Sequence, residues 1–366
     1  MEPIVRQFLK LGYQVEIYNF RRSLAEIRNT EKNLRIVDLP KHEKPGKIYK
    51  QSRTLFQNLR SNIDQDTPNI YFARSEVSSM GISILIALMF LGVRNSCVIF
   101  TQYPIYRPRF HHILWTILIK RFLRMRYFTQ VLTSFDFLDN QFARISDYGA
   151  NLRKILKQNS EYIPLPIPKI EFDTTVKNSN FISKQESRSF VTVAKCEPRK
   201  GLDLLIDKFQ SISNQLDCNW RLKIHLQVLN ENHKKFLKHL NNKYDLPNSN
   251  QIEIYINCTT EETRLSIRNS DVFILNSRNE PASFSHLEAL SLCIPIIINR
   301  SNGSSSILPN QFGVTKIETP SELRASMITY AMNVTSLKSE ISQLNMEISK
   351  IIGANALAKR WLSIAI

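Results

Sequence analysis

The chain has 366 residues, of which 43% are hydrophobic and 22% are charged. This length fits about two domains, and this composition excludes a disordered or fibrous chain. The five cysteines are odd in number and lack ligand spacing, which excludes a disulfide framework and a zinc finger and fits a reducing cytoplasm.

The net charge of +17 predicts an anionic partner, which is nucleic acid, an anionic membrane or a phosphorylated small molecule. Charge alone does not distinguish these three. The sequence has no zinc-finger, RNA-binding or cold-shock signature, so we expect no nucleic-acid partner. Its longest apolar run, residues 80–93, is shorter than the roughly 20 residues that cross a bilayer, and no signal peptide opens the chain. We therefore expect a cytoplasmic protein.

The first half of the chain alternates helical and strand patterns. Residues 3–11 have a helical pattern that starts at Pro3 and stops before Gly12. Strands are predicted at 13–18, 34–39, 69–73 and 97–101, and helices at 48–63 and 77–91. Strand alternating with helix predicts parallel βαβ units.

The second half repeats this alternation and predicts a doubly wound domain of its own. The predicted strands are 190–193, 223–229, 252–256, 272–275 and 294–298, and the helices are 202–212, 233–242, 261–268 and 283–292. A proline-rich segment at 163–168 and a polar one at 177–188 form the best linker. We expect an N-terminal domain at 1–165, a C-terminal domain at 166–345, and a final helical segment at 346–366 that packs back on the first domain.

The segment 271–290 joins an apolar strand, a polar loop and a helix that starts near Ser283. Ligands of open α/β sheets sit at the carboxyl ends of strands. Glu280 falls in the loop and Glu288 in the first turns of the helix. A nucleoside diphosphate sugar needs such an arrangement: one carboxylate for sugar hydroxyls, backbone N–H groups for the diphosphate, and a second carboxylate for the ribose.

The residues alone leave a structural interpretation open. Ser285 and Glu288 also spell a capping box, in which the glutamate bonds back to the N–H of the cap residue. A loop glutamate such as Glu280, and a basic stretch such as 199–201, are often just solvated.

Three segments, in this order, resemble one enzyme family. Residues 191–206 resemble its strand, basic loop and helix; residues 279–289 resemble its E-x7-E signature; and residues 291–303 resemble its proline, strand and glycine-turn continuation. The family is that of retaining glycosyltransferases, family 4 or glycosyl transferases group 1, which have the GT-B fold. The resemblance implies an α/β protein with two doubly wound Rossmann-like domains, the second binding the donor and the first the acceptor.

The resemblance also implies roles for the charged residues. Glu280 would hold the transferred sugar and Glu288 the ribose. Lys195 stands where the family usually has an arginine, and Lys200 stands on its lysine; both would neutralise the donor diphosphate as it leaves. Lys195 lacks the bidentate fork of an arginine, so it departs from the pattern.

The remaining donor-binding residues are Gly201 and the turn of Ser283, Phe284 and Ser285, whose N–H groups would bind the phosphates. No metal ion and no cofactor are implied beyond the UDP- or GDP-sugar donor. The one D-x-D spelling, residues 64–66, precedes a strand and predicts a surface turn.

The acceptor side departs from the family. Gln102 and Tyr103, our acceptor-side candidates, occupy the place after strand 97–101 where many members have a histidine. We assign no general base, since the leaving phosphate of a retaining transfer can accept the acceptor's proton.

The strand and glycine turn that open the family's first domain are missing before the helix at 3–11. Their absence would leave the neighbours of a central strand without a shared hydrogen-bonding partner.

The stretch 110–126 mixes apolar residues with a basic face. It fits a helix in a membrane interface, facing a lipid-linked acceptor, and equally a domain helix packed on its sheet.

We thus expect a glycosyltransferase that moves a hexose to a saccharide or lipid-linked acceptor in the synthesis of a cell-surface polysaccharide or glycolipid. It would be cytoplasmic, peripheral to the inner face of the plasma membrane. The alternative is a non-catalytic partner subunit that binds nucleotide or docks on the membrane.

Overall fold

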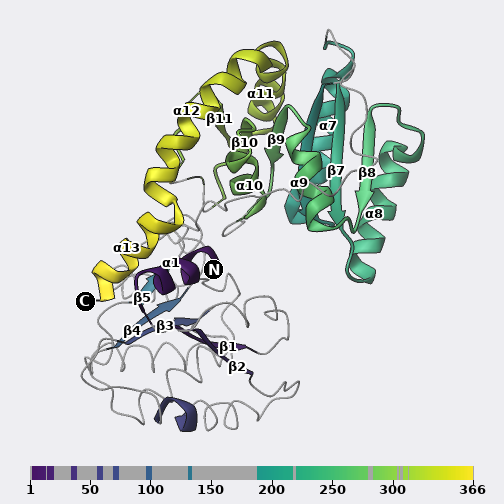
Figure 1. Cartoon of the computed structure of the whole chain (residues 1–366). Helices are drawn as coiled ribbons and strands as arrows, with labels where there is room; N and C mark the ends of the chain where they lie inside the picture. The colour runs from purple at the N-terminus through teal and green to yellow at the C-terminus, as the bar shows by residue number, and fades with distance from the viewer. Residues whose placement is uncertain are drawn as a thin grey trace, which may run out of the picture. The chain divides into compact units, whose positions relative to one another are not determined.

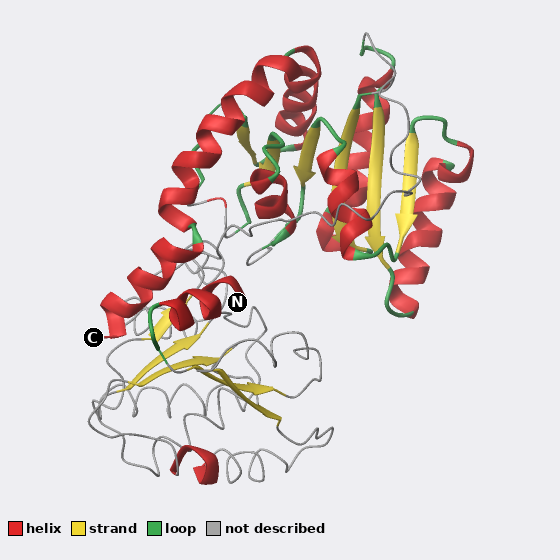
Figure 2. Cartoon of the chain, in the orientation of Figure 1, coloured by secondary structure: helices red, strands yellow, loops and turns green. Residues whose placement is uncertain are grey.

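The structure is a computed structural model that describes residues 2–13, 15–19, 34–38, 56–60, 69–73, 96–100, 131–133, 188–216, 220–278, 283–302, 305, 308–311 and 313–365. Its chain divides into two compact units (Figure 1). Unit 1 contains Met1–Pro166 and Ala354–Ile366, and unit 2 contains Ile167–Gly353. Each unit combines parallel strands with helices (Figure 2).

Unit 1 begins with the helix α1 (Glu2–Lys10). Gly12 ends it with a left-handed φ of 87°, and Phe8 and Leu9 bury the apolar side of the helix. The C-terminal helix α13 (Ala354–Ala365) is in contact with α1 and buries Leu357 and Ala358. Two distant stretches of sequence therefore share one apolar contact.

The described strands of unit 1 form two separate parallel ribbons. One pairs β1 (Val15–Asn19) with β2 (Leu34–Asp38), and the other orders β3 (Asn69–Ala73), β4 (Ser96–Phe100) and β5 (Val131–Thr133). No pairing joins β1 to β3 among these strands. In the strand order 3-2-1-4-5-6 of a doubly wound sheet, a strand lies at that junction.

The sequence predicted α1 and β1 to β4 to within two residues at each end. Of the helix predicted at 48–63, the structure describes residues 56–60, which are helical. The helix predicted at 77–91 lies outside the described residues.

Unit 2 is a six-stranded, all-parallel sheet in the order β11-β10-β9-β6-β7-β8. Its strands are β6 (Ser189–Lys195), β7 (Arg221–Gln227), β8 (Ile252–Ile256), β9 (Val272–Leu275), β10 (Ile296–Asn299) and β11 (Val314–Ile317). Counted from β6, the order is 3-2-1-4-5-6 in reverse, which is the doubly wound order of dinucleotide-binding domains. The direction of winding reverses between β6 and β9.

The described helices of unit 2 lie between these strands or follow the last of them (Figure 1). They are α7 (Leu202–Ser213), α8 (Glu231–Tyr244), α9 (Thr260–Arg268), α10 (Ser285–Ser291), α11 (Pro320–Met332) and α12 (Val334–Ile352), with short 3-10 turns at Pro198–Lys200 and Leu246–Asn248. Capping boxes start α9 (Thr259 with Glu262) and α11 (Thr319 with Glu322), which satisfies backbone donors at both starts.

The core of unit 2 lies along the central strands. Every residue of β9 and β10 is buried, as expected for parallel strands that are covered on both faces. Phe190 stacks on Trp220 at 4.5 Å between ring centroids and meets Phe209 edge-on at 6.3 Å. These aromatic side chains hold β6 in place, and β6 is the strand that leads into the loop beginning at Cys196.

The end of unit 2 differs from the expected one. No sequence pattern predicted β11 or α11, and the domain boundary expected at residue 345 falls inside α12. The helix α12 has one continuous apolar stripe that extends on both sides of residue 345. Its buried residues are 334, 337, 341, 344 and 348. The units divide after Gly353 instead. Among the described helices, none is both long enough and apolar enough to span a membrane.

Candidate donor site

The topological switch point of unit 2 lies between β6 and β9, where ligands of open α/β sheets bind at the carboxyl ends of the strands. The loop after β6 runs from Lys195 to Gly201, and the loop after β9 starts at Asn276 and leads to α10. The two loops that were predicted from the sequence to bind the donor therefore both lie at the switch point of this sheet.

The loop after β6 is cationic. Lys195 is exposed, and Lys200 ends the 3-10 turn. Glu197 pairs with Arg199 at 2.8 Å and lies 3.4 Å from His233. Burial alone would raise the pKa of Glu197, but Arg199, Lys200 and Lys195 together lower it, so this carboxylate stays ionised. Three cations against one carboxylate leave the loop positively charged.

Gly201 ties this loop to the loop after β9. Its φ of 63° is left-handed, and the side-chain amide of Asn276 donates to its carbonyl oxygen at 3.0 Å. A Cβ at Gly201 would lie 2.6 Å from the backbone oxygen of Asn276. The N–H of Arg278 also donates to the carbonyl oxygen of Arg199 at 2.8 Å. The two loops are thus held together by backbone contacts that leave no room for a side chain at position 201.

The turn before α10 does not form the predicted capping box. The helix starts at Ser285, its cap residue is Phe284, and no side chain caps it. The hydroxyl of Ser283 instead bonds that of Ser285 at 2.8 Å, and Phe284 is exposed. The capping-box interpretation of Ser285 and Glu288 is therefore wrong, because the carboxylate of Glu288 has another partner.

That partner is Arg264 on α9. Its Nε and Nη2 both donate to Oε1 of Glu288, at 3.0 and 2.9 Å. The Glu288 side chain is 18% exposed and that of Arg264 is 28% exposed. No sequence pattern pointed to Arg264, since no helical or strand period relates residues 24 positions apart.

Polar side chains beside these loops are buried. Asn276 and Ser277 follow β9 directly, and His286 on α10 is 0% exposed. Neither ring nitrogen of His286 has a hydrogen-bond partner within the described part of the chain. Burial lowers the pKa of His286 to about 3, so this ring is neutral at physiological pH.

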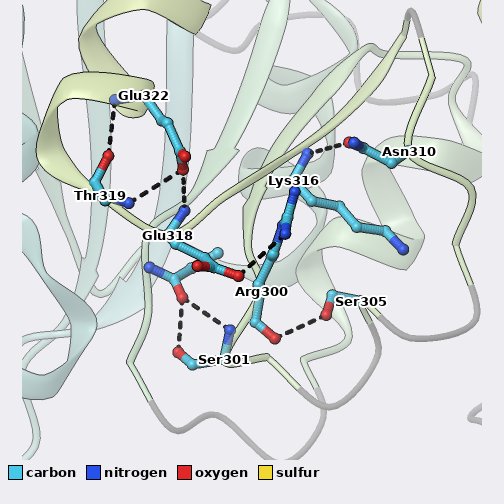
Figure 3. Close-up of polar contacts among 9 residues, drawn as sticks. Arg300, Ser301, Ser305, Asn310, Lys316, Glu318, Thr319 and Glu322 are labelled. Atoms are coloured by element: carbon cyan, nitrogen blue, oxygen red, sulfur yellow. Dashed lines mark hydrogen bonds and ion pairs between the residues drawn. The ribbon is translucent and has the colours of Figure 1, made fainter.

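A second polar group lies at the carboxyl ends of β10 and β11 (Figure 3). Arg300 pairs with Glu318 at 3.1 Å, and Asn299 accepts hydrogen bonds from the N–H and hydroxyl of Ser301. Asn310 accepts from the N–H of Lys316 at 3.0 Å. Burial and the neighbouring Arg300 lower the pKa of Lys316. These contacts fix the turns at this end of the sheet, next to the predicted glycine turn, whose Gly303 lies outside the described residues.

The structure places seven of the ten predicted site residues: Lys195, Lys200, Gly201, Ser283, Phe284, Ser285 and Glu288. Glu280, Gln102 and Tyr103 lie outside the described residues, as do the D-x-D turn at 64–66 and the basic stretch at 110–126. No group of three or more metal-ligating side chains occurs within the residues that the structure describes.

Comparison with known proteins identifies a family domain in the second half of the chain. Residues 174–334 match the model of the family Glycosyl transferases group 1. A search among curated proteins finds no match.

Solved structures resemble the chain over nearly its whole length. A glycosyltransferase from Rickettsia africae ESF-5 has a TM-score of 0.74 at 13% identity, covering 100% of this chain and 93% of its own. Anabaena Alr3699/HepE in complex with UDP has 0.67 at 11%, covering 99% and 94%. A trehalose-6-phosphate synthase, studied for glycosyl transfer with retention, has 0.67 at 9%, covering 96% and 98%. The chain therefore has a GT-B fold and carries a glycosyl transferases group 1 domain.

Proposed function

We propose that the protein is a retaining glycosyltransferase that moves a hexose from a UDP- or GDP-sugar to a saccharide or lipid-linked acceptor. The observation that carries this proposal is the convergence of the cationic loop 195–201 and the Glu288 segment at the switch point of unit 2. UDP in the Anabaena structure supports a uridine donor. The retention studied in the trehalose-6-phosphate synthase supports the stereochemical outcome.

Lys195 and Lys200 neutralise the diphosphate in this proposal, and their charge supports a transfer without a metal ion. We assign this task to the lysines, and only a secondary one to the turn at 283–285, because α10 has only seven residues. Gly201 lets the loop approach the end of β9 closely. Glu288 accepts hydrogen bonds from the ribose hydroxyls, and Glu280 holds the transferred sugar.

The reaction then runs on one face of the sugar. The bond between the anomeric carbon and the diphosphate oxygen breaks, and the acceptor hydroxyl oxygen bonds to the same face of the oxocarbenium-like sugar. The proton of that hydroxyl goes to the departing diphosphate, so no protein base is needed. Gln102 and Tyr103 lie on the acceptor side in this proposal. A cytoplasmic enzyme peripheral to the plasma membrane, acting in cell-surface polysaccharide or glycolipid synthesis, is the setting that we propose.

The substitution Glu280→Ala tests the assignment. We expect it to abolish hexose transfer from UDP- and GDP-sugars while leaving UDP or GDP binding and thermal unfolding unchanged. Glu231→Ala is the matched control, because Glu231 is an exposed glutamate of α8 that pairs only with Lys234 among the described residues. Unchanged turnover in Glu280→Ala would remove the assignment.

A non-catalytic, nucleotide-binding partner subunit is the second candidate function. It is favoured by the break between β1 and β3 in the described part of unit 1 and by Gln102 at the usual histidine position. Tight binding of UDP or GDP, without hydrolysis or transfer of any nucleotide sugar, would select this candidate.

A further inference from the structure

We infer that Arg264 is a positioning residue for nucleotide recognition, one that holds the carboxylate of Glu288 in the orientation that binds the ribose diol. This inference rests on the proposed function, because it assigns the partner of Glu288 a task in donor binding. Arg264 comes from a different segment from the three that resemble known transferases.

The contact has a definite shape. Two N–H groups of the guanidinium converge on one oxygen, Oε1 of Glu288, at 3.0 and 2.9 Å. Among the described residues, no hydrogen bond reaches Oε2. A carboxylate has about four acceptor positions, so a vicinal diol can donate to Oε2 and to the remaining lone pair of Oε1 while Arg264 stays in place.

Burial explains why this carboxylate needs a partner. Glu288 is 18% exposed, and an ionised carboxylate at that depth loses much of its hydration. Arg264 compensates this loss and, through its planar fork, restricts the side-chain torsions of Glu288. A carboxylate that is already oriented loses less conformational freedom when the ribose arrives.

The pair is not required to dock the two helices. Ser266 and Ile267 of α9 and Leu287 and Leu290 of α10 are buried, so both helices are fixed by side chains that face the interior. Removing Arg264 leaves the partly buried carboxylate of Glu288 without this partner, which costs some stability. The helices stay docked through their apolar side chains, so we expect the variant to fold and its nucleotide binding to be measurable.

The experiment compares nucleotides with and without the diol. UDP and 2′,3′-dideoxy-UDP are titrated by calorimetry into the full chain and its Arg264→Met variant, and GDP with 2′,3′-dideoxy-GDP replaces them if the protein prefers guanine. Wild type should bind the ribonucleotide about tenfold or more tightly than the dideoxy form, the effect expected for hydrogen bonds to a charged group. Arg264→Met should lose most of this ratio, with the affinity for the dideoxy form changed by less than about twofold.

Arg221→Met is the matched control. This substitution breaks another Arg–Glu pair of unit 2, in which Arg221 lies 2.6 Å from Glu253. Arg221 is the first residue of β7, so the pair lies at the amino-terminal end of this strand, whereas the site lies at the carboxyl ends of the strands. The diol ratio of Arg221→Met should equal that of wild type. The double variant Arg264→Met/Glu288→Gln should bind UDP no more weakly than Glu288→Gln alone, because the two residues act through one contact.

Equal weakening of both nucleotides in Arg264→Met would overturn the inference, as would a full diol ratio in that variant. If Arg264→Met does not fold, Arg264→Lys decides, since it keeps the charge and one donor: a partial loss confined to the ribonucleotide supports the inference, and an unchanged ratio overturns it. Wild type that binds UDP without diol preference removes the inference but leaves the proposed function. Wild type that binds neither UDP nor GDP removes both.

Discussion

The substitution Gly201→Ala tests whether the two loops at the switch point are held as closely as the structure has them. Its new Cβ would lie 2.6 Å from the backbone oxygen of Asn276 and 2.7 Å from the side-chain nitrogen of that residue. Both distances are far below a normal contact, and the backbone oxygen can move only if the end of β9 moves. The hydrogen bond from Asn276 to Gly201 is lost in the same displacement.

Gly313→Ala supplies the matched control in the same unit. Gly313 also has a left-handed φ, 93°, but its Cβ would meet Ile341, whose nearest atom, Cδ1, lies at 3.4 Å, an ordinary contact. Both variants pay about 1–2 kcal/mol for placing alanine in that region. Gly201→Ala adds about 1 kcal/mol for the hydrogen bond and about 1–3 kcal/mol for the forced shift. We therefore expect Gly201→Ala to be the more destabilising by about 2–4 kcal/mol.

Urea unfolding followed by the fluorescence of Trp220 measures this difference. Trp220 is 2% exposed in the core of unit 2, and replacing the other two tryptophans, Trp115 and Trp361, by phenylalanine in every variant makes it the sole reporter. The midpoint shift multiplied by the common slope gives the cost of each substitution. Equal costs for Gly201→Ala and Gly313→Ala would show that the close contact between Gly201 and Asn276 does not exist.

Two further substitutions test the interior of unit 2. His286 has a pKa of about 3 when folded, against about 6.5 for an unfolded histidine, so the unfolded chain binds more protons below about pH 6.5 and stability falls as the pH drops. His286→Leu should reduce the loss of unfolding free energy between pH 8 and pH 5 by about 2 kcal/mol, and parallel pH profiles would contradict this. Tyr330→Phe should cost about 1–2 kcal/mol at pH 7, because the buried hydroxyl donates to the carbonyl oxygen of Ile296 at 3.2 Å and lies 2.9 Å from the hydroxyl of Thr315. An unchanged urea midpoint would show that neither contact stabilises the fold.

Periodicity predicted most of unit 2, and it did so where apolar runs are bounded by turn residues. The five strands and four helices expected between residues 190 and 298 are all present, with ends shifted by a few residues. The short strand β11 was missed because its four residues, Val314–Ile317, alternate too briefly to exceed the background of loop sequences. The boundary expected at residue 345 falls inside α12, because the apolar stripe of this helix was not recognised before residue 346.

Only those residues of the candidate site that lie within short sequence motifs could be predicted from the sequence. Lys195, Lys200 and Glu288 lie within the segments that resemble known transferases, so a short motif identifies them. The partner of Glu288 depends on how α9 and α10 pack, and the contact of Gly201 with Asn276 depends on which strand lies beside β6. Such long-range pairings follow from topology, and the capping-box interpretation was wrong because it considered only neighbours along the chain.

The most direct test of the donor site is a calorimetric titration of UDP and GDP into the full chain and into its Lys195→Ala/Lys200→Ala variant. We expect saturable binding of at least one of these nucleotides at one site per chain. We also expect an affinity at least about tenfold weaker in the double variant, because each lysine contributes a charge-assisted contact to the diphosphate. Absence of binding by the wild-type chain, or equal binding by the double variant, would contradict the claim that the switch point of unit 2 receives a nucleoside diphosphate.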